Sequence, residues 1–204
     1  MGSEEQYDVL NRRGEKTGVA KSKSEVHERG LWHGAMNLCI TDGRGNIYIQ
    51  RRGGLPHVNI FPNKWDIYAA AGHMSAGSTV LDTVCQEMGE EIGQKFTPDE
   101  LKDHQLTKVA VAVGEYWVPD SRFVSGGFQH RVFDHLYVVC MELDIPSLVL
   151  EANKVVAVEL VPIGQVRADI LNAKSPTRSF AQRPPNSNAN YLKVLRAAEW
   201  LKAR

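Results

Sequence analysis

The 204-residue chain has the length of one domain, and its 24 lysine and arginine residues balance 24 aspartate and glutamate residues. This zero net charge argues against a protein that holds nucleic acid polymers or anionic membranes by bulk charge. Hydrophobic residues make up 43% of the chain, which is enough for a core without disulfides. Cys39, Cys85 and Cys140 each lie in an apolar stretch and are expected to be reduced. With no visible signal peptide or membrane-spanning run, we expect a cytoplasmic protein.

The first half of the chain predicts a hairpin followed by a third, shorter strand. Alternating apolar residues predict strands over 36–41 and 47–50, and the residues between them are Asp and Gly, which favour tight turns. A loop rich in Gly, Pro and Asn is predicted over 53–64. Small and apolar residues over 66–71 then indicate a short strand.

The clearest helix is predicted from Leu81 to Ile92, where apolar residues recur at i, i+3, i+4, i+7 and i+11. Thr79 and Asp82 have the spacing of a capping box at its start. Gly93 stands where a glycine commonly ends a helix.

The second half predicts three strands and a closing helix. The strands are expected over 107–113, 135–143 and 155–161, followed by a polar loop over 173–190 and a helix over 191–202. Strands and helices that alternate in this way indicate an α+β domain, layered as an α/β/α sandwich with a mixed sheet.

Three carboxylates share one flank of the first helix and form the main functional signal. Glu87, Glu90 and Glu91 fall at i, i+3 and i+4, so they are neighbours on the helix surface and repel one another. A divalent cation would remove that repulsion, and oxygen ligands of this kind suit Mg²⁺, with Mn²⁺ as an alternative. The competing interpretation is an ordinary solvated acidic face.

The context of this cluster resembles the Nudix box, a glycine followed by a helix bearing Arg-Glu-x-x-Glu-Glu and a second glycine. Six specified positions match: Gly72, Glu87, Met88, Glu90, Glu91 and Gly93. Three positions depart from the pattern, with Ser78 in place of a Glu, Gln86 in place of the Arg, and Gln94 in place of an apolar residue. Flanking stretches, including 30–33, 50–52, 64–66 and 71–73, resemble the Nudix branch that is similar to isopentenyl-diphosphate isomerases.

The resemblance implies the Nudix fold, with its loop-helix-loop, over most of the chain. It implies an N-terminal leader over 1–30 packed on the domain, a Nudix hydrolase domain over 31–162, and a C-terminal loop and helix over 163–204 that belong to the same domain. It also implies that Glu87, Glu90 and Glu91 are catalytic and hold Mg²⁺, and that a metal-activated water attacks phosphorus in a diphosphate linkage. The expected partner is a small phosphorylated substrate, and a homodimer is left open.

The same resemblance places substrate-binding roles on Arg51, Lys64, His73 and Gly72. Strand alternation sends Arg51 and its neighbour Arg52 to opposite faces, and Arg51 is the better match for a phosphate clamp. Solvated surface positions are the alternative for Arg51 and Lys64. His33 and His73, with His27 as a looser match, also occupy positions of isomerase metal ligands, and a structural role is the alternative.

Three functions remain open on the sequence: a hydrolase, a non-catalytic Nudix binding module and an isomerase. Ser78 and Gln86 motivate the binding module. The isomerase is disfavoured because Ala71 stands where the related enzymes use a cysteine. Glu115 and Asp134 are candidates for a supplementary carboxylate, and residues 115–135 are expected to set specificity, with Tyr116, Trp117, Phe123 and Phe128 able to contact a substrate or to pack in the core.

Overall fold

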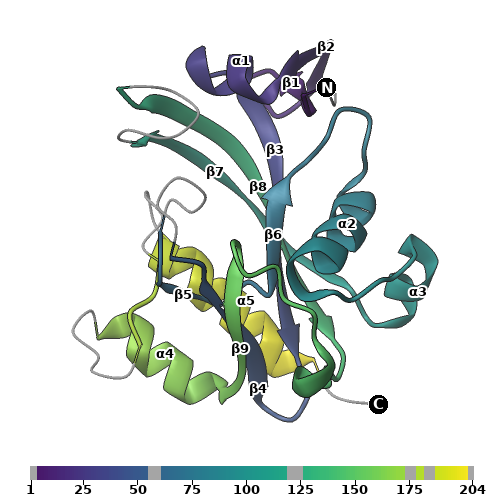
Figure 1. Ribbon diagram of the computed structural model, residues 1–204, viewed down its shortest axis with the longest axis vertical. Helices are drawn as coiled ribbons and strands as arrows, with labels where there is room; N and C mark the ends of the chain where they lie inside the picture. Colours follow the sequence, from purple (N-terminus) through teal and green to yellow (C-terminus); the bar gives the residue numbers. More distant parts are fainter. Residues whose placement is uncertain (1–3, 55–60, 119–125, 173–177, 182–186, 202–204) are drawn as a thin grey trace.

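A mixed β-sheet lies between two layers of helices in the computed structural model, which describes residues 4–54, 61–118, 126–172, 178–181 and 187–201 (Figure 1). Nine strands of these residues join one sheet. The α+β class and the α/β/α sandwich predicted from the sequence are therefore confirmed.

The centre of the sheet is β3 (Trp32–Thr41), which pairs with β8 (Phe128–Cys140) in parallel along its whole length. The short strand β6 (Ala70–His73) runs antiparallel to β3. Strand β7 (Thr107–Val118) pairs with the far side of β8 in an antiparallel ladder. This arrangement brings the ends of β6 and the starts of β3 and β8 to the same region of the molecule.

A second group of strands meets β3 near its carboxyl end. Strand β4 (Asn46–Arg52) follows β3 through the predicted Asp/Gly turn and pairs with β9 (Val155–Pro162). Strand β5 (Trp65–Asp66) lies on the other side of β4, with Asp66 opposite Gln50.

The N-terminal segment is itself folded. Strands β1 (Gln6–Leu10) and β2 (Lys16–Ser22) form a hairpin, and α1 (Lys23–Glu28) follows directly. Leu10 pairs with Trp32, which attaches the hairpin to the start of β3. The sequence predicted a packed leader here but did not predict these strands or this helix, because few apolar residues mark them.

The remaining helices divide between the two faces of the sheet. They are α2 (Val80–Ile92), α3 (Pro98–Asp103), the 3₁₀ turn η1 (Ile145–Ser147), α4 (Ile163–Leu171) and α5 (Ser187–Trp200). Alternation along β3 sends Met36, Leu38 and Ile40 into one core with α2, whereas Cys39 packs with α4 and α5. Among the described residues, no helix has the length and apolar character needed to cross a bilayer.

Several element boundaries differ from the sequence expectations. The single strand predicted over 66–71 is wrong: β5 ends at Asp66, β6 starts at Ala70, and the residues between them leave the ladder while remaining buried. Strand β8 starts seven residues before the predicted 135, and β7 continues five residues past 113. Polar residues within the added segments, such as Glu115 in β7 and Gln129 and Arg131 in β8, interrupted the apolar pattern and hid these extensions.

The last helix also differs from its prediction. Helix α5 starts at Ser187 and ends at Trp200, so it takes in four residues that were assigned to the polar loop. Serine and asparagine at the start of a helix resemble loop composition, which explains the error. Helices α3 and α4 were not predicted because both are short.

Candidate active site

Helix α2 positions the acidic cluster, and its ends are fixed as predicted. The Thr79 hydroxyl accepts from the Asp82 backbone N–H at 3.2 Å, and Asp82 accepts from the Thr79 backbone N–H at 2.8 Å. Gly93 ends the helix with a φ of 71°. Burial of Val84 and Met88 against β3 and β6 sets the rotation of the helix, so the acidic flank lies beside β6.

Glu87 lies directly on the backbone of Gly72. A Cβ atom built on Gly72 would overlap the Glu87 carboxylate, so the glycine is required by the close approach of helix and strand. Glu87 is 9% exposed, and burial, followed by the charge of Glu91, raises its pKa to about 8. A carboxylate held here without a counter-charge therefore binds a proton.

Glu91 is the more deeply held of the two buried carboxylates. One of its oxygens, Oε2, accepts a hydrogen bond from the Ala71 backbone N–H at 3.2 Å and lies 3.4 Å from Nε2 of Gln50. Burial nevertheless raises the pKa of Glu91 to about 7, against the opposing charges of Arg52 and Lys154. Two neighbouring carboxyl groups with raised pKa values form a site that a cation would stabilise.

Glu90 is exposed and has two hydrogen-bonding partners. Gln86 Nε2 donates to its Oε1 at 2.9 Å, and Lys154 Nζ donates to its Oε2 at 2.9 Å. Although partial burial opposes the shift, these bonds lower the pKa of Glu90. Gln86 therefore contacts a carboxylate from the position where the motif has arginine, and Lys154 supplies the positive charge.

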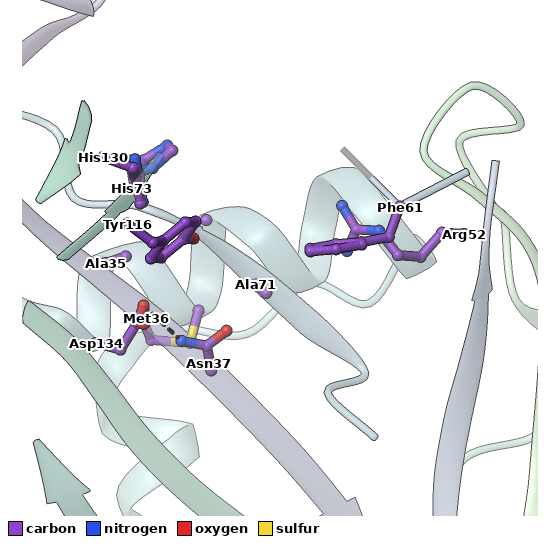
Figure 2. A pocket seen from close by; sticks show the side chains of 11 residues that line it. Ala35, Met36, Asn37, Arg52, Phe61, Ala71, His73, Tyr116, His130 and Asp134 are labelled. Atoms are coloured by element: carbon purple, nitrogen blue, oxygen red, sulfur yellow. Dashed lines mark hydrogen bonds between the residues drawn. The ribbon is translucent and has the colours of Figure 1, made fainter. Parts of the chain in front are cut away.

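A pocket of about 140 Å³ opens beside this cluster (Figure 2). Ala71 and Gly72, which contact Glu91 and Glu87, line this pocket, but Glu87, Glu90 and Glu91 are not themselves among its lining residues. Arg52 and Phe61 lie at one side of the pocket, and His73 and Tyr116 lie at the other (Figure 2). The lining residues are Ala35, Met36, Asn37, Arg52, Phe61, Ala71, Gly72, His73, Tyr116, His130 and Asp134.

Of the residues expected to bind substrate, Gly72 and His73 line the pocket. Arg51 is exposed and does not line it, whereas Arg52 does, because alternation along β4 turns the two arginines to opposite sides. Lys64 does not line the pocket: its exposed side chain donates to Ser179 Oγ at 2.8 Å, while its carbonyl accepts from the Arg52 backbone N–H at 2.9 Å.

Of the supplementary carboxylate and aromatic candidates, some line the pocket and others do not. Asp134 lines the pocket and accepts from Asn37 Nδ2 at 3.0 Å, whereas Glu115 is paired with Arg131 at 2.8 Å. Among the aromatic candidates, Tyr116 lines the pocket, Trp117 is 58% exposed and Phe128 is buried. Phe123 lies outside the described residues.

Sequence reasoning missed Lys154, Gln50 and His130. Gln50 stands beside the two arginines in a stretch that resembles the family, and that neighbourhood was a usable signal. Lys154 lies 64 residues after Glu90 in a turn, and only the fold brings the two together. His130 falls in a strand that was predicted to start later.

The donor set fits the divalent cation that the motif implies. Glu87 and Glu91 present carboxylate oxygens, which are the ligands that Mg²⁺ and Mn²⁺ prefer. The absence of a side chain at Gly72 lets the Glu87 carboxylate approach the strand, and burial raises the pKa of both carboxyls despite the positive charge of Lys154. Oε1 of Gln50, buried beside Glu91, has no hydrogen-bond partner among the described residues.

Known proteins match both the sequence and the fold. The model of the NUDIX domain matches residues 31–183. Nudix hydrolase 3 of Arabidopsis thaliana is 32% identical over 94% of this chain, which spans 23% of that protein's length. An uncharacterised Nudix hydrolase of Clostridium acetobutylicum is 28% identical over 72% of this chain and 65% of its own length.

More distant matches agree with these. An isopentenyl-diphosphate isomerase of Serratia proteamaculans is 26% identical over 58% of this chain and 57% of its own length. The crystal structure of a Deinococcus radiodurans protein superposes with a TM-score of 0.62 at 15% identity, covering 93% of this chain and 99% of that one, which supports the fold. The matched domain model covers most of the chain, and the chain therefore belongs to the Nudix family.

Proposed function

We propose that the chain is a Mg²⁺-dependent hydrolase that cleaves the diphosphate linkage of a nucleotide or another small organic diphosphate. The observation that carries this proposal is the convergence of Glu87 and Glu91 on the Ala71–Gly72 wall of a pocket that Arg52 also lines. Carboxylates suit a cation and a guanidinium suits phosphate, and Ala71 and Gly72 connect the two, since they contact the carboxylates and line the pocket with Arg52.

Each group has a distinct part in this mechanism. Glu87 and Glu91 would hold the cation, and Glu90 would add a third carboxylate from the exposed side of α2. Bound there, the cation would neutralise charge on the diphosphate and lower the pKa of the attacking water. Arg52, held at 3.5 Å from the buried Asp66, binds phosphate oxygens and orients the anhydride. We therefore assign to Arg52 the clamp role that the resemblance gave to Arg51.

The test is hydrolysis of a panel of nucleoside di- and triphosphates, nucleotide sugars, dinucleoside polyphosphates and prenyl diphosphates, with and without Mg²⁺, measured as release of phosphate, pyrophosphate or a phosphomonoester. Glu91→Gln should reduce kcat/KM by at least ~100-fold, since the charge that holds the cation is lost. Glu142→Gln is the matched control, because Glu142 pairs with Arg44 away from the pocket and should leave activity unchanged.

Two other outcomes would replace this proposal. Retained ligand binding without turnover on any substrate would favour the binding module that Ser78 and Gln86 suggest. Allylic product without phosphate release would favour an isomerase, although no cysteine is among the described lining residues of the pocket. The hydrogen bond from Gln86 to Glu90 weighs against the binding module, since the substituted side chain still contacts its carboxylate.

A further inference from the structure

Asp66 is a fully buried carboxylate beside the arginine that lines the pocket. It ends β5, and its side chain has no exposed area. The β4–β5 ladder places Asp66 opposite Gln50, and Gln50 and Arg52 share one side of β4 because side chains alternate along a strand. Asp66 and Arg52 are therefore diagonal neighbours across the ladder, with Asp66 Oδ2 lying 3.5 Å from Nη1 of Arg52.

The other carboxylate oxygen of Asp66 accepts two hydrogen bonds from outside β4. The Tyr191 hydroxyl donates to Asp66 Oδ1 at 2.9 Å, and the Tyr68 backbone N–H donates to the same oxygen at 3.2 Å. A buried carboxylate costs free energy unless its oxygens are hydrogen-bonded, so these donors stabilise Asp66 in place. They also fix the rotation of the carboxylate and thereby keep Oδ2 on the side of Arg52.

Tyr191 is held firmly enough to act as an anchor. It lies on α5, is 1% exposed, and its ring packs edge-on against that of Tyr68 with a centroid separation of 5.4 Å. It belongs to the hydrophobic core that α4 and α5 form with the sheet. Through Asp66, the C-terminal helix therefore reaches the pocket, although no site residue was predicted in the segment 163–204.

Arg52 has room for both an anchor and a ligand. Asp66 is the acidic residue that forms an ion pair with Arg52 among the residues that the structure describes. The buried Nε of Arg52 has no hydrogen-bond partner among these same residues. A guanidinium that is already oriented loses less conformational freedom when it binds a phosphate group, and its fork geometry toward two phosphate oxygens is kept.

We propose that Tyr191 is a positioning residue, which acts through Asp66 to hold Arg52 in the orientation that binds substrate phosphate. This role rests on the function proposed above, in which Arg52 binds the diphosphate. It gives α5 a part in substrate affinity in addition to its part in the hydrophobic core.

The test is binding of methylenediphosphonate, a non-hydrolysable diphosphate, with Mg²⁺ to the full chain by isothermal titration calorimetry, which requires no turnover. Tyr191→Phe removes only the hydroxyl and should raise Kd by about 3–10-fold, which corresponds to one hydrogen bond. Asp66→Asn should raise Kd by at least ~10-fold, because the charge that faces Arg52 is lost. On any hydrolysed substrate, Tyr191→Phe should raise KM in the same proportion and change kcat little, since uniform binding is lost.

Tyr48→Phe is the matched control for Tyr191→Phe. The Tyr48 hydroxyl accepts from the buried Leu143 backbone N–H at 2.9 Å, and Tyr48 does not line the pocket. Both variants lose a buried hydroxyl, but Tyr48→Phe should leave Kd unchanged. In ¹⁵N spectra, the Arg52 Nε–H signal, identified by its absence in Arg52→Gln, should move in Tyr191→Phe and stay in place in Tyr48→Phe.

A double-mutant cycle separates positioning from a general structural effect. Arg52→Gln should itself raise Kd by at least ~10-fold, and Tyr191→Phe should add little in that background, because no guanidinium remains to be held. A Tyr191→Phe effect that persists there, an equal effect of Tyr48→Phe, or an Arg52 signal that does not move would overturn the positioning role.

The same measurements distinguish failure of this role from failure of the proposed function. If Arg52→Gln binds methylenediphosphonate as tightly as the wild type, the phosphate clamp is wrong, and the role of Tyr191 falls with it. If Arg52→Gln weakens binding and Tyr191→Phe does not, the clamp stands and only the role of Tyr191 is refuted.

Discussion

Among the glycines of the described residues, Gly72 has the shortest contact to an added Cβ atom, because the Glu87 carboxylate occupies that position. Gly72→Ala should displace Glu87, lower hydrolysis by at least ~100-fold and destabilise the fold by ~1–3 kcal/mol through overpacking. Steady-state kinetics and urea unfolding measure the two effects. Gly164→Ala is the matched control, since nothing lies within 4 Å of its added methyl group. Equal behaviour of the two variants would contradict the contact.

Lys154 donates to Glu90 at 2.9 Å and brings a positive charge to the carboxylate that Gln86, at the arginine position of the motif, contacts without charge. Although burial opposes it, ion pairs with Glu90 and Glu151 raise the pKa of Lys154, which keeps it charged. Lys154→Met should therefore lower kcat by ~10-fold, as loss of an outer partner typically does.

Gln86→Arg provides the matching rescue, because residue 86 already reaches Glu90. In the wild-type background Gln86→Arg should change kcat little, whereas in the Lys154→Met background it should restore most of the loss. A double-mutant cycle on kcat measures this coupling. Additive effects would show that the two side chains act on Glu90 independently, or not at all.

Helix α2 is the element whose sequence and structure agree best, and its cap can be tested. Thr79→Ala removes the acceptor of the Asp82 backbone N–H and should lower the free energy of unfolding by about 1 kcal/mol. Thr79→Ser keeps that acceptor and should stay within a few tenths of a kcal/mol of wild type. Urea unfolding distinguishes them, and an equal loss in both would assign the effect to the threonine methyl group.

The agreement for α2 has a local cause. Its stripe, its capping box and its terminal glycine lie within fifteen residues and need no partner to be recognised. The approach of Glu87 to Gly72 was not predicted, because the motif gives the spacing of the two residues along the chain and not their contact in space. The ion pair between Lys154 and Glu90 could not be predicted from the sequence. The two residues are far apart along the chain, and the pairing of β4 with β9 brings them together.

The arginines show a second limit of sequence reasoning. Alternation predicted that Arg51 and Arg52 point to opposite sides, but it could not say which side faces the pocket. That depends on β4 pairing with β5 and on Asp66 being buried beside Arg52. The family resemblance carries no information on this strand pairing, and it favoured Arg51.

The whole molecule has zero net charge, but it contains two buried groups of titratable residues. Their contributions to the free energy of unfolding change with pH in opposite directions. In the carboxylate region, Glu87 and Glu91 have raised pKa values of about 8 and about 7. The folded chain retains protons there that the unfolded chain loses above about 4.5. Stability should therefore fall as pH rises from there to about 8, by up to ~1.4 kcal/mol per pH unit for each carboxyl.

The buried histidines beside the pocket respond in the opposite direction. His27, His33 and His73 have lowered pKa values, so below about 6.5 the unfolded chain binds protons that the folded chain does not. Their contribution to stability is complete above pH 6.5 and is lost as pH falls toward the folded values of about 4 and about 3. The two regions together place the maximum stability of the metal-free chain near pH 6.5.

Urea unfolding in the presence of a chelator at pH 5.5, 6.5 and 8.0 tests this maximum. Stability should be lower at both outer values, and Glu87→Gln/Glu91→Gln should remove the decline toward pH 8.0 while keeping the decline toward pH 5.5. Saturating Mg²⁺ should also reduce the alkaline decline, because cation binding requires ionised carboxylates and stabilises only the folded state. A wild-type stability that is constant from pH 6.5 to 8.0 would show that the two carboxyls are already ionised, and the electrostatic argument for a cation at Gly72 would then fail.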